Sequence, residues 1–95
     1  MRKEKNDMIK ENVDDYIKRE TLLMELEYEL IQEFVKLRKD LHLTQQQMAD
    51  SAHVIRETIA RIETQITSPQ ISTLIKILEP LGYTLKIEKI KKSNK

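Results

Sequence analysis

The sequence predicts an all-α domain, and three observations support this fold class. The 95 residues include one Gly and two Pro, too few for a turn-rich β sandwich or barrel. Charged residues make up 35% and apolar residues 39%, which suits a helical domain with long solvated faces. Apolar residues recur at steps of three and four along much of the chain, the spacing of one helix face. A chain of this length forms one small domain with a modest core.

Composition also excludes several classes of function. The chain has no Cys, which excludes disulfides and thiolate metal sites. It has only two His, His42 and His53, which we assign to loops rather than to a metal or catalytic site. No apolar run has the length of a transmembrane helix, and none follows the basic N-terminus as in a secretion signal. We therefore expect a cytoplasmic protein without membrane contact, enzymatic activity, cofactor or metal.

Charge divides the chain into two parts. Residues 1–33 carry 6 basic and 10 acidic side chains, a net charge of −4. Residues 34–95 carry 11 basic and 6 acidic side chains, a net charge of +5. An acidic segment joined to a basic one indicates two partners of opposite charge. The alternative is that the acidic residues simply solvate a helix.

The N-terminal part is expected to be helical after residues 1–12, which are polar and expected to be frayed or disordered. Apolar residues at i, i+3 and i+4 begin at Val13, and two Asp follow it in what would be the first turn. A second apolar stripe comprises Leu22, Leu23, Leu26, Leu30, Phe34, Leu37 and Leu41. One long helix would fit this pattern, and so would two helices with a break near Glu20 and Thr21.

Two short helices follow, separated by three residues. Thr44 can cap the backbone N–H of Gln47, whose amide can reach back to Thr44, which is a capping box. The helix that starts there is expected to end near Ser51. Residues 52–54 interrupt the pattern, and a second helix is predicted over residues 55–63.

A further helix is expected after residues 64–67, which have poor helix propensity. Ser68 would be its N-cap and Pro69 its first helical residue. Gly82 is the expected C-terminal cap. Pro80 predicts a kink or an early stop in the last turn, because proline has no N–H to donate.

The apolar period changes to two after Gly82, which predicts a strand over residues 83–90. A lone strand is not stable in water. We expect the same strand of a second copy to pair with it across a dyad, giving a homodimer with Leu85 and Ile87 at its contact. The alternative is an irregular tail that packs these two side chains on the helices. Residues 91–95 would form a basic tail.

Two short helices with a three-residue break are the pattern of a helix-turn-helix. The second helix of such a unit fits the major groove and presents its first turns to base edges, while the preceding helix lies across the backbone. The start of the helix after Thr44 can bind a phosphate through free N–H groups, with the Gln45 side chain helping.

Residues 37–82 resemble the lambda-repressor-like, or XRE, family of helix-turn-helix domains. The matching residues are Leu37, Arg38, Leu43, Thr44, Gln45, Met48, Ala49, Val54, Thr58, Ile59, Arg61, Ile62, Glu63, Ser68, Pro69 and Leu74. The resemblance implies a bundle of about five helices that binds a palindromic double-stranded DNA operator as a dimer. Here the bundle would carry an N-terminal helical extension and a C-terminal strand in an intersubunit ribbon.

The resemblance also implies roles for single residues. Gln45 matches the family's phosphate-contacting glutamine, and Arg38 and Glu63 match an ion pair that ties the first helix to the recognition helix. The positions that face base edges match Arg56, Glu57 and Arg61. The DNA-binding residues that we expect are Thr44, Gln45, Arg56, Glu57, Thr58, Arg61 and Thr67.

Glu57 has more than one interpretation. It could accept a hydrogen bond from cytosine N4, pair with Arg61 at i, i+4, or only orient that arginine. The alternative for Arg56 and Arg61 is that both are solvated and contact no partner.

Three positions depart from the family pattern. His53 stands where the family usually has Gly in a positive-φ turn, a conformation that His tolerates better than β-branched residues do. Ile55 stands where Ser or Thr usually caps the recognition helix, a loss of about 1 kcal/mol. Thr64 and Gln65 replace the usual Asn-Gly after that helix.

Residues 68–74 and 81–87, together with the N-terminal extension, are similar to antitoxins of HigBA-type toxin–antitoxin modules. This resemblance implies that the chain neutralises a cognate HigB-like toxin, an mRNA endonuclease, and represses its own operon. An RNase surface is cationic, so an acidic amphipathic helix could occupy it. The expected toxin-binding residues are Asp14, Asp15, Tyr16, Ile17, Glu20, Leu22, Leu23, Glu25, Glu27 and Glu29.

Two alternatives remain at this point. The first is a stand-alone XRE-family repressor whose extension serves dimerisation. The second is a protein-interaction module with a decayed helix-turn-helix. In each case we divide the chain into the extension at residues 1–33, the helix-turn-helix domain at 34–82, the dimerisation strand at 83–90 and the tail at 91–95.

Overall fold

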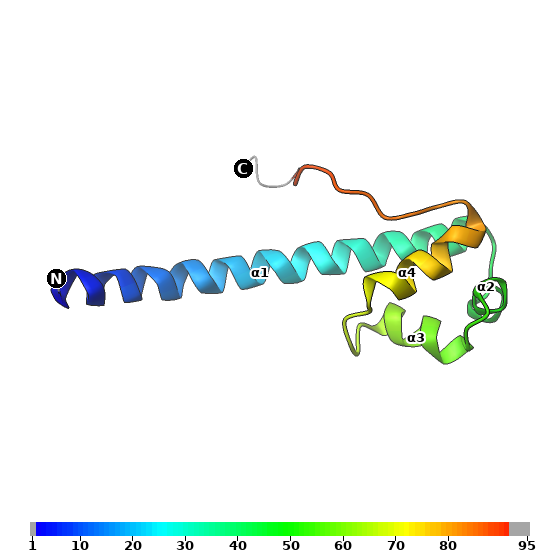
Figure 1. Cartoon of the computed structure of the whole chain (residues 1–95), viewed down its shortest axis with the longest axis horizontal. Helices are drawn as coiled ribbons and strands as arrows, with labels where there is room; N and C mark the ends of the chain where they lie inside the picture. The colour runs from blue at the N-terminus through cyan, green and yellow to red at the C-terminus, as the bar shows by residue number, and fades with distance from the viewer. Residues whose placement is uncertain (1, 92–95) are drawn as a thin grey trace.

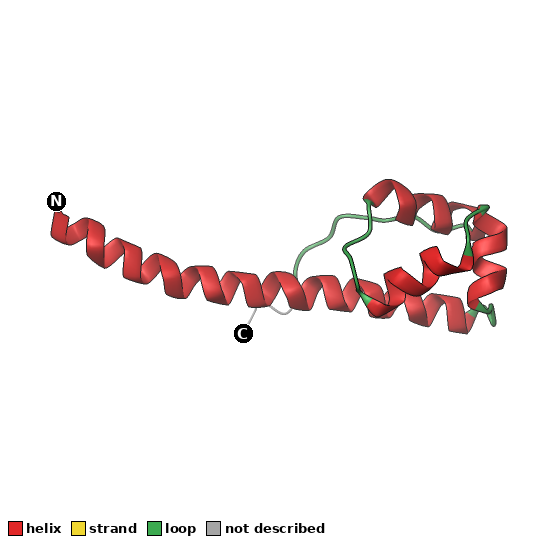
Figure 2. Ribbon diagram, turned by 90° about the horizontal axis from the view of Figure 1, so that it is seen from below, coloured by secondary structure: helices red, strands yellow, loops and turns green. Residues whose placement is uncertain are grey.

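The computed structural model describes residues 2–91, with side chains from residue 13 onward. In that part the chain is helical and contains no strand (Figures 1 and 2). Its elements are α1 (Arg2–Asp40), α2 (Gln45–Ala52), α3 (Arg56–Thr64), α4 (Ile71–Leu78) and the 3-10 turn η1 (Glu79–Leu81). The all-α prediction is confirmed, whereas the prediction of five helices is not supported.

Helix α1 is continuous over 39 residues, so the break considered near Glu20 and Thr21 does not occur. No Pro or Gly interrupts it. At 1.5 Å per residue it is about 58 Å long, close to the 59 Å longest dimension of the molecule. Its C-terminal part packs in the bundle, and its N-terminal half projects away from the other helices (Figures 1 and 2). The expected fraying of residues 1–12 stays a prediction.

The core lies where the C-terminal part of α1 meets the three short helices. Each helix contributes one apolar face to it, although Ile31 and Ile77, both fully buried, lie outside the predicted stripes. The buried side chains are Ile31 and Phe34 of α1, Met48, Ala49 and Ala52 of α2, Ile59 and Ile62 of α3, and Leu74, Ile77 and Leu78 of α4. This small core fixes how α2 and α3 are held against α1.

The ends of α2 follow from local chemistry. The Thr44 hydroxyl accepts a hydrogen bond from the Gln47 backbone N–H at 3.0 Å, and the Gln47 side-chain oxygen accepts from the Thr44 N–H at 2.9 Å. The predicted capping box is therefore confirmed. His53 ends α2 in the left-handed region with φ 59°, as expected for the position where the family usually has Gly.

The start of α4 differs from the prediction. Its N-cap is Gln70, without a side-chain cap hydrogen bond, so the predicted start at Ser68 and Pro69 is wrong. The Ser68 hydroxyl instead donates to Oε2 of Glu27 in α1 at 2.7 Å. This hydrogen bond to α1 holds Ser68 in the loop, and the helix begins three residues later, at Ile71.

The end of α4 confirms the effect of proline. The α-helix stops at Leu78, and Pro80 lies in the tighter turn η1. Gly82 closes that turn with φ 88°, and its N–H donates to the Glu79 carbonyl at 3.0 Å. The chain then leaves the bundle in an extended conformation, so no fifth α-helix forms in the described part.

Residues 83–91 run back along α1 (Figure 1). The predicted strand over 83–90 is absent from the single chain, because no other segment among residues 2–91 offers an extended backbone to pair with. Leu85 packs against the core, whereas Ile87 is 97% exposed. The tail expected at 91–95 lies, apart from Lys91, outside the described residues.

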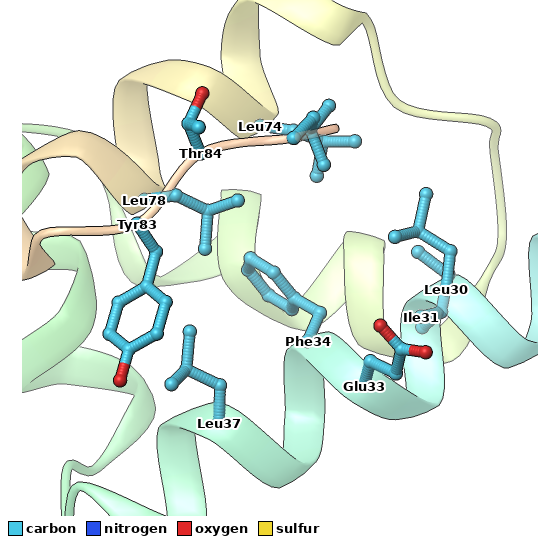
Figure 3. Close-up of a pocket in the computed structure, with 10 residues that line it drawn as sticks. Leu30, Ile31, Glu33, Phe34, Leu37, Leu74, Leu78, Tyr83 and Thr84 are labelled. Atoms are coloured by element: carbon cyan, nitrogen blue, oxygen red, sulfur yellow. The ribbon is translucent and has the colours of Figure 1, made fainter. Parts of the chain in front are cut away.

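The first residues of this C-terminal segment cover an apolar cavity of about 240 Å³ between α1 and α4. Figure 3 shows Tyr83 and Thr84 of the segment beside Leu78 of α4, with Phe34 and Leu37 of α1 to the right of the Tyr83 ring. The segment therefore extends the core along one side of α1 instead of forming a sheet.

Candidate nucleic-acid interface

The turn between α2 and α3 places the two helices at an angle. The His53 N–H donates to the Asp50 carbonyl at 3.2 Å, and the Val54 N–H donates to the Ala49 carbonyl at 3.0 Å. These bonds satisfy carbonyls that the end of α2 would leave unpaired. Val54 packs against the core. The turn is thus held by both its backbone and its side chain, which fixes the direction in which α3 leaves.

Helix α3 has a buried face and an exposed face. Ile59 and Ile62 are buried in the core. Arg56, Glu57 and Arg61 are exposed, and Thr58 is half-buried. The exposed face thus combines two cations, one anion and the hydroxyl of Thr58 at its edge. These groups can bond both phosphates and base edges.

The Arg38–Glu63 ion pair implied by the family resemblance is present. Arg38 Nε lies 2.7 Å from Glu63 Oε2, and Arg38 Nη2 lies 3.0 Å from Glu63 Oε1. The two side chains are only 12% and 9% exposed. Arg38 Nη1 also donates to the Leu43 carbonyl at 2.9 Å. This bidentate pair anchors α3 to α1 and to the loop before α2.

Gln45 extends this network to the exposed face. Its Nε2 donates to Glu63 Oε1 at 3.0 Å, and its Oε1 accepts from Arg56 Nη1 at 3.1 Å. A chain of side chains therefore runs from α1 through α3 and α2 to Arg56. The Gln45 amide retains a second N–H. It can thus orient Arg56 and still donate to a phosphate.

Arg56 is also close to its neighbour Glu57. Arg56 Nη2 lies 3.6 Å from Glu57 Oε2, with side chains 46% and 61% exposed. The pairing of Glu57 with Arg61 that we considered is not observed. Among the side chains that the structure describes, Arg61 makes no hydrogen bond or ion pair, so it has no such bond to give up on binding.

The remaining predicted DNA-binding residues lie at different places. Thr44 is at the start of α2, where its hydroxyl accepts from Gln47 and keeps its own proton for donation. Thr67 is exposed in the loop between α3 and α4, away from the Gln45 network. The structure thus brings Gln45, Arg56 and Glu57 together, and places Arg61 further along the same helix.

The comparisons with known proteins agree with this geometry. The model of the family described as helix-turn-helix, HTH_3, matches residues 35–87, more than half of the chain. The chain belongs to the helix-turn-helix family. A curated Haemophilus influenzae protein described as an uncharacterized HTH-type transcriptional regulator is 42% identical over 65 residues, which are 68% of this chain. Those residues are 66% of that relative's length. No solved structure matches the chain.

Outside the helix-turn-helix domain, the projecting half of α1 carries a second candidate surface. Its exposed apolar side chains are Val13, Tyr16, Ile17 and Leu23, and the surface continues to Met24 and Tyr28, which also line a cavity with loop residues 65–68 of the bundle. The acidic residues Asp14, Asp15 and Glu25 are exposed, and Glu20, Glu27 and Glu29 are half-buried, as is Leu22. The alternative that these apolar side chains only pack on the bundle fails for Tyr16 and Ile17, which are 63% and 56% exposed.

Three exposed apolar residues of this surface were not predicted from the sequence. Val13, Met24 and Tyr28 are 51%, 67% and 54% exposed and were not assigned to a binding face. A detectable signal existed, because Met24 and Tyr28 follow Ile17 at the i+7 and i+11 positions of one helix face.

The structure also bears on the other classes of site. Within the described residues, no group of three or more His, Cys, Asp or Glu side chains is arranged to hold a metal ion. No helix described in the structure has the length and hydropathy needed to cross a membrane.

Proposed function

We propose that the chain is a transcriptional regulator that inserts α3 into the major groove of operator DNA. The observation that carries this proposal is the arrangement of Arg56, which is exposed at the start of α3 and held there by Gln45 at 3.1 Å. An arginine held at this position can donate to guanine O6 and N7. Arg61 extends the same face. The description of the Haemophilus influenzae relative as a transcriptional regulator supports the same function.

The start of α2 would add a contact to the DNA backbone. Its first N–H groups, the Thr44 hydroxyl and the free Gln45 N–H form a donor set that suits a phosphate. Thr67 would contact the backbone from the loop after α3. Thr58 and Glu57 would lie beside the base edges that Arg56 and Arg61 contact.

Binding to a palindromic operator calls for a homodimer. The extended segment over residues 83–90 is in no β ladder in the single chain, and Ile87 is 97% exposed. A second copy pairing with this segment would form an antiparallel ribbon and cover Ile87. Leu85 would join the ribbon to the core. Two recognition helices would then face half-sites about one helical turn of DNA apart.

The test uses in vitro selection of DNA duplexes by the full chain, followed by affinity measurements at several salt concentrations. Arg56→Ala and Arg61→Ala should each cost about 1–3 kcal/mol of binding free energy and relax specificity at one base pair. Arg19→Ala removes the same charge from the exposed surface of α1 and should leave affinity for the selected site unchanged. Unchanged affinity and salt dependence in both helix α3 variants would contradict the proposal.

A second candidate function is that of an antitoxin, and the projecting half of α1 favours it. Residues 13–29 carry six acidic and two basic side chains, a net charge of −4. The exposed apolar residues of this stretch lie on a helix that leaves the bundle. An isolated helix gains little stability in water without a packing partner. A cationic mRNA endonuclease of the HigB type would match both its charge and its apolar face.

Co-expression with the adjacent reading frame tests the antitoxin function. The neighbour alone should arrest growth, and this chain should relieve the arrest and co-purify with the neighbour. Tyr16→Asp with Ile17→Asp changes two exposed side chains and should abolish relief, whereas Arg56→Ala should retain it. A harmless neighbour that does not co-purify would leave the stand-alone regulator as the function.

A further inference from the structure

Ile55 occupies an unusual position at the start of the recognition helix. It is the N-cap of α3, with φ −86° and ψ 154°, and makes no side-chain cap hydrogen bond. Its side chain is 66% exposed, whereas the preceding Val54 packs against the core. The turn thus directs Val54 inward and Ile55 outward. Packing therefore does not account for an isoleucine here.

The local physics favours a polar residue at this position. Ser, Thr, Asp or Asn would accept a hydrogen bond from an N–H in the first turn and stabilise α3. The neighbouring helix α2 has such a cap at Thr44. Ile55 gives up that hydrogen bond and also exposes an apolar surface. Its branched Cβ restricts the side chain to few rotamers, so the exposed methyl groups are held in place.

We propose that Ile55 contacts the C5-methyl group of a thymine in the major groove. This inference rests on the proposed DNA binding by α3. The thymine methyl is the apolar group that base pairs present in the major groove. The first turn of a recognition helix is the part that reaches base edges. An isoleucine that is uncapped, exposed and next to Arg56 has the chemistry and the location for this contact.

The neighbouring Arg56 makes the inference more specific. Its guanidinium is held by Gln45 at 3.1 Å, and arginine pairs best with guanine in the major groove. Because Ile55 and Arg56 are consecutive, the thymine that Ile55 contacts lies next to or near the guanine that Arg56 contacts. Each half-site is therefore expected to contain a thymine close to a guanine.

The test replaces single methyl groups in DNA. Sites are first selected with the full chain from a random duplex library. Each thymine of the selected site is then replaced in turn by deoxyuridine, which removes only the C5-methyl group. One replacement in each half-site should lower the affinity of the unmodified protein about fourfold, the effect of one buried methyl-sized group. The Ile55→Ser protein should bind both duplexes equally.

Two controls keep the test interpretable. Serine is a good N-cap, so Ile55→Ser should fold at least as well as the original chain. Ile71→Ser changes an isoleucine of α4 that is 67% exposed and belongs to neither proposed surface, and it should retain the fourfold methyl effect. Thermal unfolding of each variant checks the fold.

Two results would overturn the inference while leaving DNA binding intact. One is a selected site at which no thymine responds to replacement. The other is a methyl effect of the same size in the original and Ile55→Ser proteins, because another side chain would then make the contact. If no duplex is enriched over non-specific DNA, the proposed function itself fails, and the Ile55 inference fails with it.

Discussion

The Glu63 carboxylate connects three helices through two side chains. It lies in α3 and accepts hydrogen bonds from Arg38 of α1 and Gln45 of α2. The ion pair is largely buried, so water screens it little and each partner depends on the other. Gln45 in turn holds Arg56. One buried carboxylate therefore contributes both to stability and to the orientation of the proposed base-contacting arginine.

Removing Arg38 should destabilise the fold strongly. Arg38→Ala leaves Glu63 largely buried without its cation, which typically costs about 3–5 kcal/mol of unfolding free energy. Urea denaturation followed by circular dichroism measures this loss. Lys36→Ala is the control, because Lys36 pairs with Asp40 on the exposed surface of the same helix. If Arg38→Ala lowers the unfolding free energy no more than Lys36→Ala does, the stabilising role of the buried pair is contradicted.

The sequence predicted some of these residue contacts and not others. The Arg38–Glu63 pair and the capping box at Thr44 followed from a family position and from local spacing. The bond from Arg56 to Gln45 did not, because it depends on the angle between α2 and α3. That angle is set by the left-handed turn at His53, which sequence spacing alone does not specify.

Helix α1 shows how an apolar pattern can extend beyond the core that it helps to build. The stripe predicted from Leu22 to Leu41 suggested one packed face, yet Leu23 and Leu41 are 46% and 38% exposed. Ile31, in the middle of this stretch, is only 1% exposed, although it was not part of the predicted stripe. The short helices cover only the C-terminal part of α1. The spacing of apolar residues identifies a helix, but the length of the helices packed against it decides which part of that helix is buried.

The predicted start of α4 was wrong, and the predicted C-terminal strand is not formed in the single chain, for a related reason. Ser68 and Pro69 fit a helix start by local rules, but Ser68 bonds to Glu27, 41 residues away in sequence. The alternation after Gly82 fits a strand, but a strand also needs a partner backbone. Both features depend on tertiary or quaternary contacts that local sequence does not contain.

The extended segment yields a prediction about dimerisation. Ile87→Ser should weaken self-association without lowering the unfolding free energy of the monomer, because Ile87 is 97% exposed in the single chain. Leu85→Ser should weaken both, since Leu85 packs against the core. Sedimentation velocity over a range of concentrations measures the association, with exposed Ile71→Ser as the control. An Ile87→Ser dimer of undiminished strength would exclude the ribbon.

At the scale of the whole molecule, the two candidate surfaces lie on different parts of an elongated chain. The molecule measures 59 × 26 × 18 Å, with the bundle at one end and the N-terminal half of α1 at the other (Figure 2). The exposed face of α3 carries Arg56 and Arg61, whereas residues 13–29 have a net charge of −4. The two proposed binding surfaces are therefore separated along the molecule and differ in charge.

The two surfaces should therefore be separable by mutation. Tyr16→Asp with Ile17→Asp should abolish capture of a cationic partner protein and leave operator affinity within about twofold, since surface changes at a distance seldom couple. Arg56→Ala should have the reverse effect. Both activities are measured on the same preparation of each variant: capture of the co-expressed neighbour by pull-down, and affinity for the operator duplex. Loss of both activities in either protein would mean that the surfaces are not independent.

The central claim is that α3 of this helix-turn-helix protein binds DNA, and amide NMR of the full chain tests it most directly. Unlabelled operator duplex is titrated into the labelled protein at physiological salt. Signals from α3, from the turn at residues 53–55 and from the start of α2 should shift, while those of residues 13–24 stay unchanged. Shifts confined to residues 13–24, or an equal response to an unrelated duplex, would contradict the account.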